Sequence, residues 1–157
     1  MYNLDWIKLK KSLRQGVGKY FLIGLLLVFL DQVTKYLFTG KFIDFGFFAI
    51  TYVRNFGISF VLFQGINNLI IVISFLAIGF LYYNRNEFKD HPLLLTMIIS
   101  GIIGNLIDRI FRGFVVDFID FKVWPVFNFA DVYLVVGILA FVLFSFQKSS
   151  KSSKRSK

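Results

Sequence analysis

The 157-residue sequence contains no cysteine and only one histidine, and acidic residues are scarce, nine against eighteen lysines and arginines. The missing cysteines exclude disulfides, thiolate metal ligands and cysteine nucleophiles, and a single histidine cannot build a histidine-rich zinc site. Chemistry in this protein must therefore rely on carboxylates, hydroxyls, amides or basic side chains. We expect no metal site and no cofactor.

Apolar residues, by contrast, are abundant: 57% of the chain is hydrophobic and the mean hydropathy is +0.69. Soluble domains are only about 45–50% apolar, so the composition indicates a membrane protein of one small domain, residues 1–147. The net charge of +9 is concentrated in basic blocks at both chain ends, next to apolar runs. We attribute this charge to contact with a membrane surface and expect no nucleic-acid partner.

The predicted fold class is an all-α membrane protein with four transmembrane helices, over about residues 20–38, 67–83, 92–110 and 129–146. Each of these segments approaches the roughly 20 apolar residues that cross a bilayer as a helix. Residues 40–65 mix aromatic and β-branched residues with glycine and predict short strands. Residues 112–128 are expected to be extended or loop-like, and the Lys/Ser-rich residues 148–157 to form a disordered basic tail.

The orientation follows from the distribution of basic residues. Twelve lysines and arginines lie in the segment up to Lys19, the loop 84–91 and the tail, against five in residues 39–66 and 109–128, which contain the aromatic segments. The positive-inside tendency then predicts that both termini are cytoplasmic and that the aromatic segments face outward. A cleaved signal peptide is the alternative for the first helix, but no small-residue cleavage site follows it.

With this topology, eight polar residues gather near the outer membrane surface. Ionisable groups in spanning segments cost about 2.5–3.5 kcal/mol each at a helix centre, so a cluster of them indicates a functional site. The residues are Asp31, Asn105, Asp108, Arg109, Asp117, Asp120, Asn128 and Asp131.

Two pairs of residues in this region have a structural as well as a functional interpretation. Asp31 and Lys35 are spaced for an ion pair within one helix, which either neutralises itself or contacts a substrate. Asn128 and Asp131 have the spacing of an N-cap and its N3 partner. Asp117, on an extended segment, is placed to fold back toward Asp131. Two neighbouring carboxylates share a proton, which is the chemistry of an aspartic hydrolase.

Other classes of function fit less well. The sequence has neither the HExxH of a zinc peptidase nor a glycine-flanked serine nucleophile. One alternative is a small proton-coupled transporter or channel that uses Asp31, Asp108 and Asp131 as a relay, although no inverted repeat is visible. The other alternative is a non-catalytic membrane scaffold in which the aspartates are replaceable.

Five motifs occur in order along the chain: "DQVTK" (31–35), "RNFGISF" (54–60), "GIIGNLIDR" (101–109), "VVDFID" (115–120) and "FNFAD" (127–131). Together they resemble lipoprotein signal peptidase, also called signal peptidase II, from the first helix to the last. The resemblance implies a four-helix membrane aspartyl endopeptidase with an extracytoplasmic β-cradle, here about residues 40–65. It also implies cleavage of a prolipoprotein immediately before a diacylglyceryl-modified cysteine.

The resemblance also implies roles for individual residues. Asp117 and Asp131 match the catalytic pair, and Asp120 is expected at the rim. The residues matched to substrate binding or support are Asp31, Lys35, Asn55, Gly57, Asn105, Asp108, Arg109, Asn128 and Ala130. The departures from the family pattern are Ile58 and Ser59 after Gly57, and Ser100 where a second glycine is common.

The expected location is the cell membrane, with several passes and the active site near the outer surface. The expected partners are a diacylglyceryl-modified prolipoprotein and membrane lipids, and the expected state is a monomer. His91 matches nothing in the family and is expected in a cytoplasmic loop beside Pro92.

Overall fold

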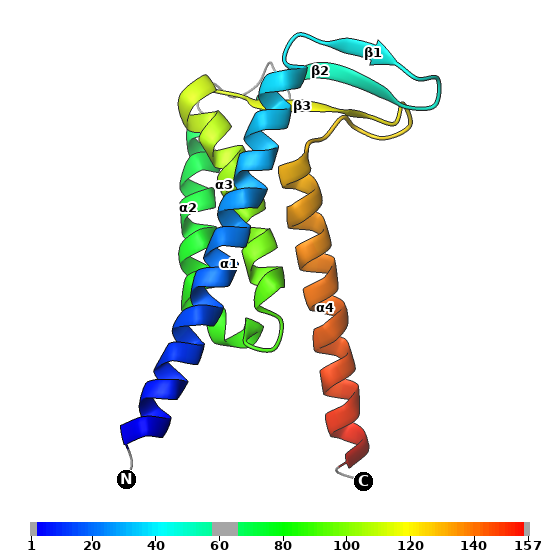
Figure 1. The fold of residues 1–157 in the computed structure, drawn as a ribbon. Coiled ribbons are helices and arrows are strands. Elements are labelled where there is room, and N and C mark those ends of the chain that lie inside the picture. Colours follow the sequence, from blue (N-terminus) through cyan, green and yellow to red (C-terminus); the bar gives the residue numbers. More distant parts are fainter. Residues whose placement is uncertain (1–2, 58–65, 156–157) are drawn as a thin grey trace.

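The computed structural model describes residues 3–57 and 66–155, in which four long helices stand beside one another and a small sheet caps one end (Figure 1). The helices are α1 (Asn3–Phe38), α2 (Ile66–Tyr83), α3 (Pro92–Arg112) and α4 (Phe129–Arg155), with a short 3₁₀ helix, η1 (Arg85–Phe88), after α2. Each long helix contains a stretch of 18 to 21 residues apolar enough to cross a membrane. The prediction of four membrane-spanning helices is confirmed.

Three helix boundaries differ by more than one residue from the sequence-based expectation. α1 begins at Asn3 and not near residue 20. α3 continues to Arg112 and ends at Gly113, which adopts a left-handed conformation with φ +78°. α4 continues to Arg155, so the expectation of a disordered tail is wrong for residues 148–155. Starting a helix fixes several residues for one hydrogen bond, whereas lengthening it fixes only one residue for each further bond. A polar segment can therefore continue the helix that the apolar residues have formed.

The central helix of the bundle is α3, which packs against α1, α2 and α4. Two glycines allow the closest approaches. A Cβ on Gly101 would collide with the backbone oxygen of Ala130 in α4, and one on Gly104 would lie 2.6 Å from a carboxylate oxygen of Asp31 in α1. Both glycines therefore lie where helices meet closely, as small residues commonly do between helices in membranes.

The sheet has three antiparallel strands in the order β1 (Phe42–Asp44), β2 (Ala49–Asn55) and β3 (Val115–Asp120) within the described residues. The strands predicted in residues 40–65 are confirmed for β1 and β2, whereas residues 58–65 lie outside the described part. The segment expected to be extended or loop-like supplies β3. Its pairing with β2 sets Asp117 opposite Val53.

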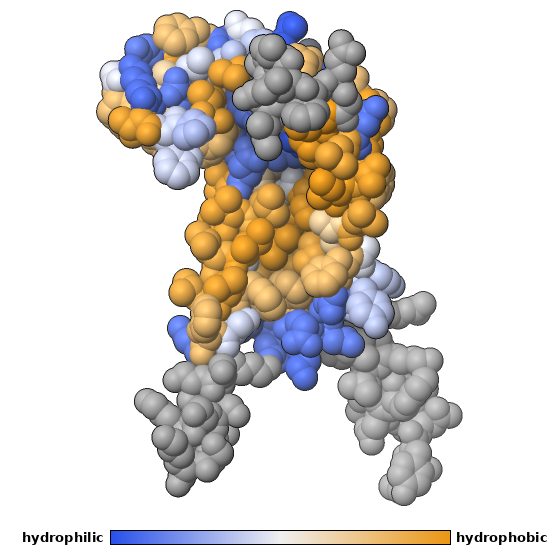
Figure 2. Space-filling view, turned by 180° about the vertical axis from the view of Figure 1, so that it is seen from behind, coloured by the Kyte–Doolittle hydropathy of each residue, from blue (hydrophilic) through white to orange (hydrophobic). Residues whose placement is uncertain are grey.

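The outer surface of the bundle is apolar along its middle and hydrophilic at both ends (Figure 2). Large apolar side chains are exposed on the helices, among them Phe21, Leu76 and Phe146. The fully buried side chains include Asp31, Lys35, Asp108, Asp117 and Asn128, which lie where the sheet meets the helices. A hydrocarbon solvent explains this inverted pattern, because apolar groups gain nothing by avoiding lipid.

Candidate active site

The structure joins all eleven predicted site residues into one hydrogen-bonded and ionic network at the junction of sheet and helices. The members are Asp31, Lys35, Asn55, Gly57, Asn105, Asp108, Arg109, Asp117, Asn128, Ala130 and Asp131. Asp120 instead accepts hydrogen bonds from Thr51 and from the backbone N–H of Lys122. These bonds are separate from the network.

Asp131 is held at the first turn of α4 by a reciprocal cap. The backbone N–H of Asn128 donates to Asp131 Oδ2 at 3.1 Å, and the backbone N–H of Asp131 donates to Asn128 Oδ1 at 3.0 Å. This is the capping box that the spacing predicts. The remaining amide group, Asn128 Nδ2, donates to Asp117 Oδ1 at 2.6 Å. One asparagine therefore both caps α4 and ties the two aspartates together.

Asp117 projects from β3 toward this cap and is also held by β2. Asn55 Nδ2 donates to Asp117 Oδ2 at 2.8 Å, while Asn55 Oδ1 accepts the backbone N–H of Gly57 at 2.8 Å. The backbone of Gly57 has φ +89°, a conformation that residues other than glycine rarely adopt. Because the N–H of Gly57 fixes the oxygen side of the Asn55 amide, the NH₂ side must face Asp117.

Burial raises the pKa of Asp117 to about 6. The hydrogen bonds from Asn55 and Asn128 oppose this rise, and the negative charge of Asp131 adds to it. The charge of Asp131 is therefore close enough to influence the protonation of Asp117.

Asn105, from α3, completes the hydrogen bonding of Asp131. Its Oδ1 accepts a hydrogen bond from Lys35 Nζ at 3.0 Å, and its Nδ2 donates to Asp131 Oδ1 at 2.7 Å. An ammonium group only donates, so it fixes which side of the Asn105 amide faces the aspartate. As a result, each of the four oxygens of Asp117 and Asp131 accepts one amide N–H.

Lys35 lies between two carboxylates, with Nζ 2.8 Å from Asp31 Oδ2 and 3.0 Å from Asp108 Oδ2. All three side chains are fully buried. Asp31 Oδ1 accepts the backbone N–H of Ala130 at 2.9 Å, and Asp108 Oδ2 accepts that of Val116 at 3.1 Å. The two acids thus hold the start of α4 and the strand that carries Asp117. Because the oxygens of Asp31 and Asp108 already bind Lys35 and these backbone groups, a structural role fits both residues better than substrate contact or a proton relay.

Arg109 lies beside the two aspartates, close enough for their charges to act on its guanidinium. Its Nη1 donates to the backbone oxygen of Asn105 at 3.3 Å. Its Nε is buried and has no hydrogen-bond partner among the described residues. The guanidinium is therefore a cationic group at the site whose hydrogen-bonding capacity is only partly used.

Two residues that the sequence analysis did not single out also support the network. Gln32 Nε2 donates to Asp31 Oδ2 at 3.1 Å and to the backbone oxygen of Gly104 at 3.0 Å. Asn67 Nδ2, from α2, donates to the backbone oxygen of Arg109 at 3.2 Å. Gln32 could have been predicted, because it lies inside the "DQVTK" motif. Asn67 could not, because the sequence around it is also that of an ordinary helix cap.

The fold and the site together define a class: a multi-pass membrane protein with two amide-linked aspartates where a small sheet meets one end of the helix bundle. Residues 23–147 match the family model described as signal peptidase (SPase) II. The chain therefore belongs to the signal peptidase II family, membrane proteases of aspartic type that process lipoproteins.

Relatives and solved structures agree with this assignment. Lipoprotein signal peptidase of Fusobacterium nucleatum subsp. nucleatum is 40% identical over 139 residues, covering 79% of this chain and 84% of its own. That of Clostridioides difficile is 40% identical over 145 residues, covering 85% and 98%. A bacterial membrane enzyme solved by the in meso method at 2.3 Å resolution has a TM-score of 0.71 at 29% identity, covering 87% and 92%.

Proposed function

We propose that this protein cuts the signal peptide from prolipoproteins immediately before a diacylglyceryl-modified cysteine, with Asp117 and Asp131 as the catalytic pair. The observation that carries the proposal is the side chain of Asn128, which donates to Asp117 while its oxygen and backbone cap Asp131. No other pair of carboxylates among the described residues is joined in this way without an intervening cation.

The mechanism requires one proton to be shared by the two acids. The ionised aspartate removes a proton from water, which attacks the scissile carbonyl carbon. The protonated aspartate donates to the carbonyl oxygen, and the resulting tetrahedral intermediate collapses with protonation of the leaving nitrogen. The pKa of about 6 for Asp117 supports this scheme, because it keeps a proton available to the pair close to neutral pH.

The donors around the pair help this chemistry by preventing rearrangement. Asn55 and Asn105 each present an NH₂ group to one aspartate, and neither amide can flip without facing a donor with another donor. The oxygens of both acids are therefore held in place before substrate arrives. Such preorganisation is a principal source of enzymatic rate enhancement.

The proposed setting is the cell membrane, with both termini in the cytoplasm and the site near the outer surface. Support comes from the two chain ends and η1, which lie opposite the sheet (Figure 1), and from the basic residues concentrated at those ends. A lipid-anchored substrate must be cut where its anchor holds it, at the membrane interface. We propose a monomer, because one chain supplies the whole network.

The test is incubation of the purified protein with lipidated and unlipidated forms of one prolipoprotein at equal concentration. The lipidated form should yield the shortened product and the unlipidated form much less, because each buried methylene of the anchor contributes about 0.8 kcal/mol to positioning the cysteine. Equal cleavage of both forms would contradict the lipoprotein specificity. No cleavage of either would contradict the proposed function.

A further inference from the structure

The first turns of α2 lie against two supports of the active site. Asn67 Nδ2 donates to the backbone oxygen of Arg109 at 3.2 Å. One turn further along α2, Ile70 packs against Gly57, where a Cβ would lie 2.8 Å from Ile70 Cδ1. The N–H of Gly57 in turn fixes the amide that holds Asp117. The start of α2 is therefore held beside residues that support the two aspartates.

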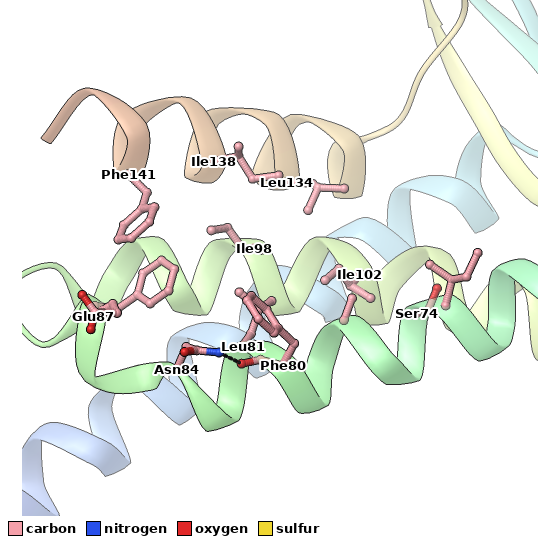
Figure 3. A pocket seen from close by; sticks show the side chains of 13 residues that line it. Ser74, Phe80, Leu81, Asn84, Glu87, Ile98, Ile102, Leu134, Ile138 and Phe141 are labelled. Carbon is pink, nitrogen blue, oxygen red and sulfur yellow. Dashed lines mark hydrogen bonds between the residues drawn. The ribbon is translucent and has the colours of Figure 1, made fainter. Parts of the chain in front are cut away.

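Further along α2, the described contacts are apolar or local. None of the side chains of this helix is buried, and Ser74 donates within the helix, to the backbone oxygen of Ile70 at 2.8 Å. An apolar groove of about 580 Å³ separates α2 from α4, and Figure 3 shows Phe80 on one side of it and Ile138 on the other. Apolar contacts fix a helix only weakly in a membrane, because lipid is as apolar as the side chains. The bond of Asn67 therefore matters for the position of α2 against α3.

Arg109 is held through both its backbone and its side chain. Its carbonyl accepts the bond from Asn67, while its Nη1 donates to the backbone oxygen of Asn105, four residues earlier, at 3.3 Å. Arg109 is one of the last four residues of α3, whose carbonyl groups generally need partners from outside the helix. A shift of this last turn would move the guanidinium relative to the two aspartates. Asn67 restrains the turn from outside.

The position of this guanidinium matters to the catalytic pair. The charges of Asp131 and Asp117 act on Arg109, and the interaction is mutual. A nearby cation favours the ionised form of a carboxyl group, so its distance helps to set the pH range in which the pair holds one proton. The other titratable groups at the junction are Asp31 and Lys35 on α1, Asp108 and Arg112 on α3 and Tyr133 on α4, and α2 carries no charged side chain.

Stability alone gives little reason for an asparagine at position 67. Its Oδ1 is buried and has no hydrogen-bond partner among the described residues. An unpaired buried acceptor destabilises the fold, which offsets the gain from the bond that Nδ2 makes. A leucine of similar shape would avoid this cost. The bond is therefore expected to contribute little to stability, although it restrains Arg109.

We infer that Asn67 is a positioning residue of the active site, which sets the distance of the Arg109 guanidinium from Asp117 and Asp131 by holding the last turn of α3. This inference rests on the proposed function. It adds α2, the long helix that supplies none of the eleven network residues. Asn67 acts through Arg109 and does not contact the reacting atoms.

The test compares Asn67→Leu with Asn68→Leu in the cleavage of a lipidated prolipoprotein. Asn68 is the next residue on α2 and is exposed, so its replacement is the matched control. Asn67→Leu should lower kcat about tenfold and leave KM within about twofold, because a displaced group weakens the transition state more than substrate binding. Asn68→Leu should leave both constants within about twofold of the wild type. Asn67→Ala carries the same prediction if the leucine variant does not fold.

Two further readouts separate positioning from a purely structural role. Asn67→Leu should melt within about 3 °C of the wild type in detergent, because the lost bond and the removed unpaired oxygen offset each other. The acidic limb of its kcat–pH profile should move to higher pH by at least about 0.3 units, because a more distant cation lets the pair take up a second proton more readily. A purely structural role would lower the melting temperature and leave the profile in place.

The outcomes separate this inference from the function on which it rests. If the wild-type protein cuts no lipidated precursor, the proposed function fails and this inference fails with it. If the wild type is active but Asn67→Leu and Asn68→Leu have the same kcat, the function stands and the inference is overturned. A loss of kcat in the Asn67 variants with an unmoved pH profile would also overturn it, because Asn67 would then serve packing alone.

Discussion

The two halves of α3 show how differently one helix is used at two depths. Its second half carries Gly101, Asn105 and Asp108, which are buried and contact α1, α4 and β3. In its first half most apolar side chains are only partly buried, with Leu93 43% exposed, although Ile98 is buried against Gly137 of α4. The polar half is packed and the apolar half is partly exposed, the reverse of a soluble helix.

The physical reason for this difference is the solvent. Leucine and isoleucine gain little by leaving lipid, whereas a polar group left in hydrocarbon costs several kcal/mol. The ion cluster around Lys35 satisfies all three ammonium hydrogens with Asp31, Asp108 and Asn105. Order in this protein is therefore expected to come mainly from its polar junction.

The largest expected effect is on catalysis at the junction. Asp117→Asn and Asp131→Asn should each slow cleavage of a lipidated prolipoprotein by at least about 1,000-fold, because the pair then lacks its shared proton or its base. The cleavage rate is measured from the appearance of the shortened product on a denaturing gel. Asp120→Asn, at the rim, is the control and should cut at close to the wild-type rate. Substantial activity in either dyad variant would show that the catalytic pair is misassigned.

The next effect concerns stability and contrasts a buried with an exposed lysine. Lys35→Met leaves Asp31 and Asp108 buried without a counter-charge and should lower the free energy of unfolding by about 3–5 kcal/mol. Lys122→Met removes the exposed bond to Asp44 at 2.8 Å and should leave the melting temperature unchanged. Thermal unfolding in detergent compares them. Similar shifts for both would mean that the junction is not the main source of stability.

The third effect is the pH dependence of stability at Asp117. Its pKa is raised from 3.8 to about 6 on folding, so the folded protein binds this proton more tightly than the unfolded chain does. The stabilisation is complete below about pH 4 and is lost as the pH rises through about 6, a change of about 3 kcal/mol at most. Asp117→Asn should remove this part of the pH dependence. Melting curves of the variant and the wild type with the same slope between pH 4 and 6 would contradict the assignment.

The smallest expected effect is that of metal removal. With no cysteine and one histidine in the chain, the two aspartates are proposed to act through protons alone. EDTA should leave the cleavage rate unchanged, with the detergent and substrate concentrations held constant. Loss of activity in EDTA that added metal restores would exclude the aspartyl mechanism.

Much of this organisation is predictable from local sequence patterns. The four apolar segments, the strands in residues 40–65 and the capping box at Asn128 depend on residues close together in the chain, so their spacing is sufficient evidence. The candidate site was also identifiable, because aspartates in so apolar a chain are costly unless they have a role. The motif order narrowed this role to one family.

Only the tertiary structure decides how these pieces meet. Lys35 fixes the amide of Asn105 across 70 positions of sequence, and Asp31 caps the N–H of Ala130 across 99. The pairing of β3 with β2, the part taken by Gln32 and the groove between α2 and α4 likewise depend on packing. A local pattern shows that a polar group needs a partner in the membrane. Which partner it finds is decided by the arrangement of helices and sheet that pairs most of the buried polar groups with one another.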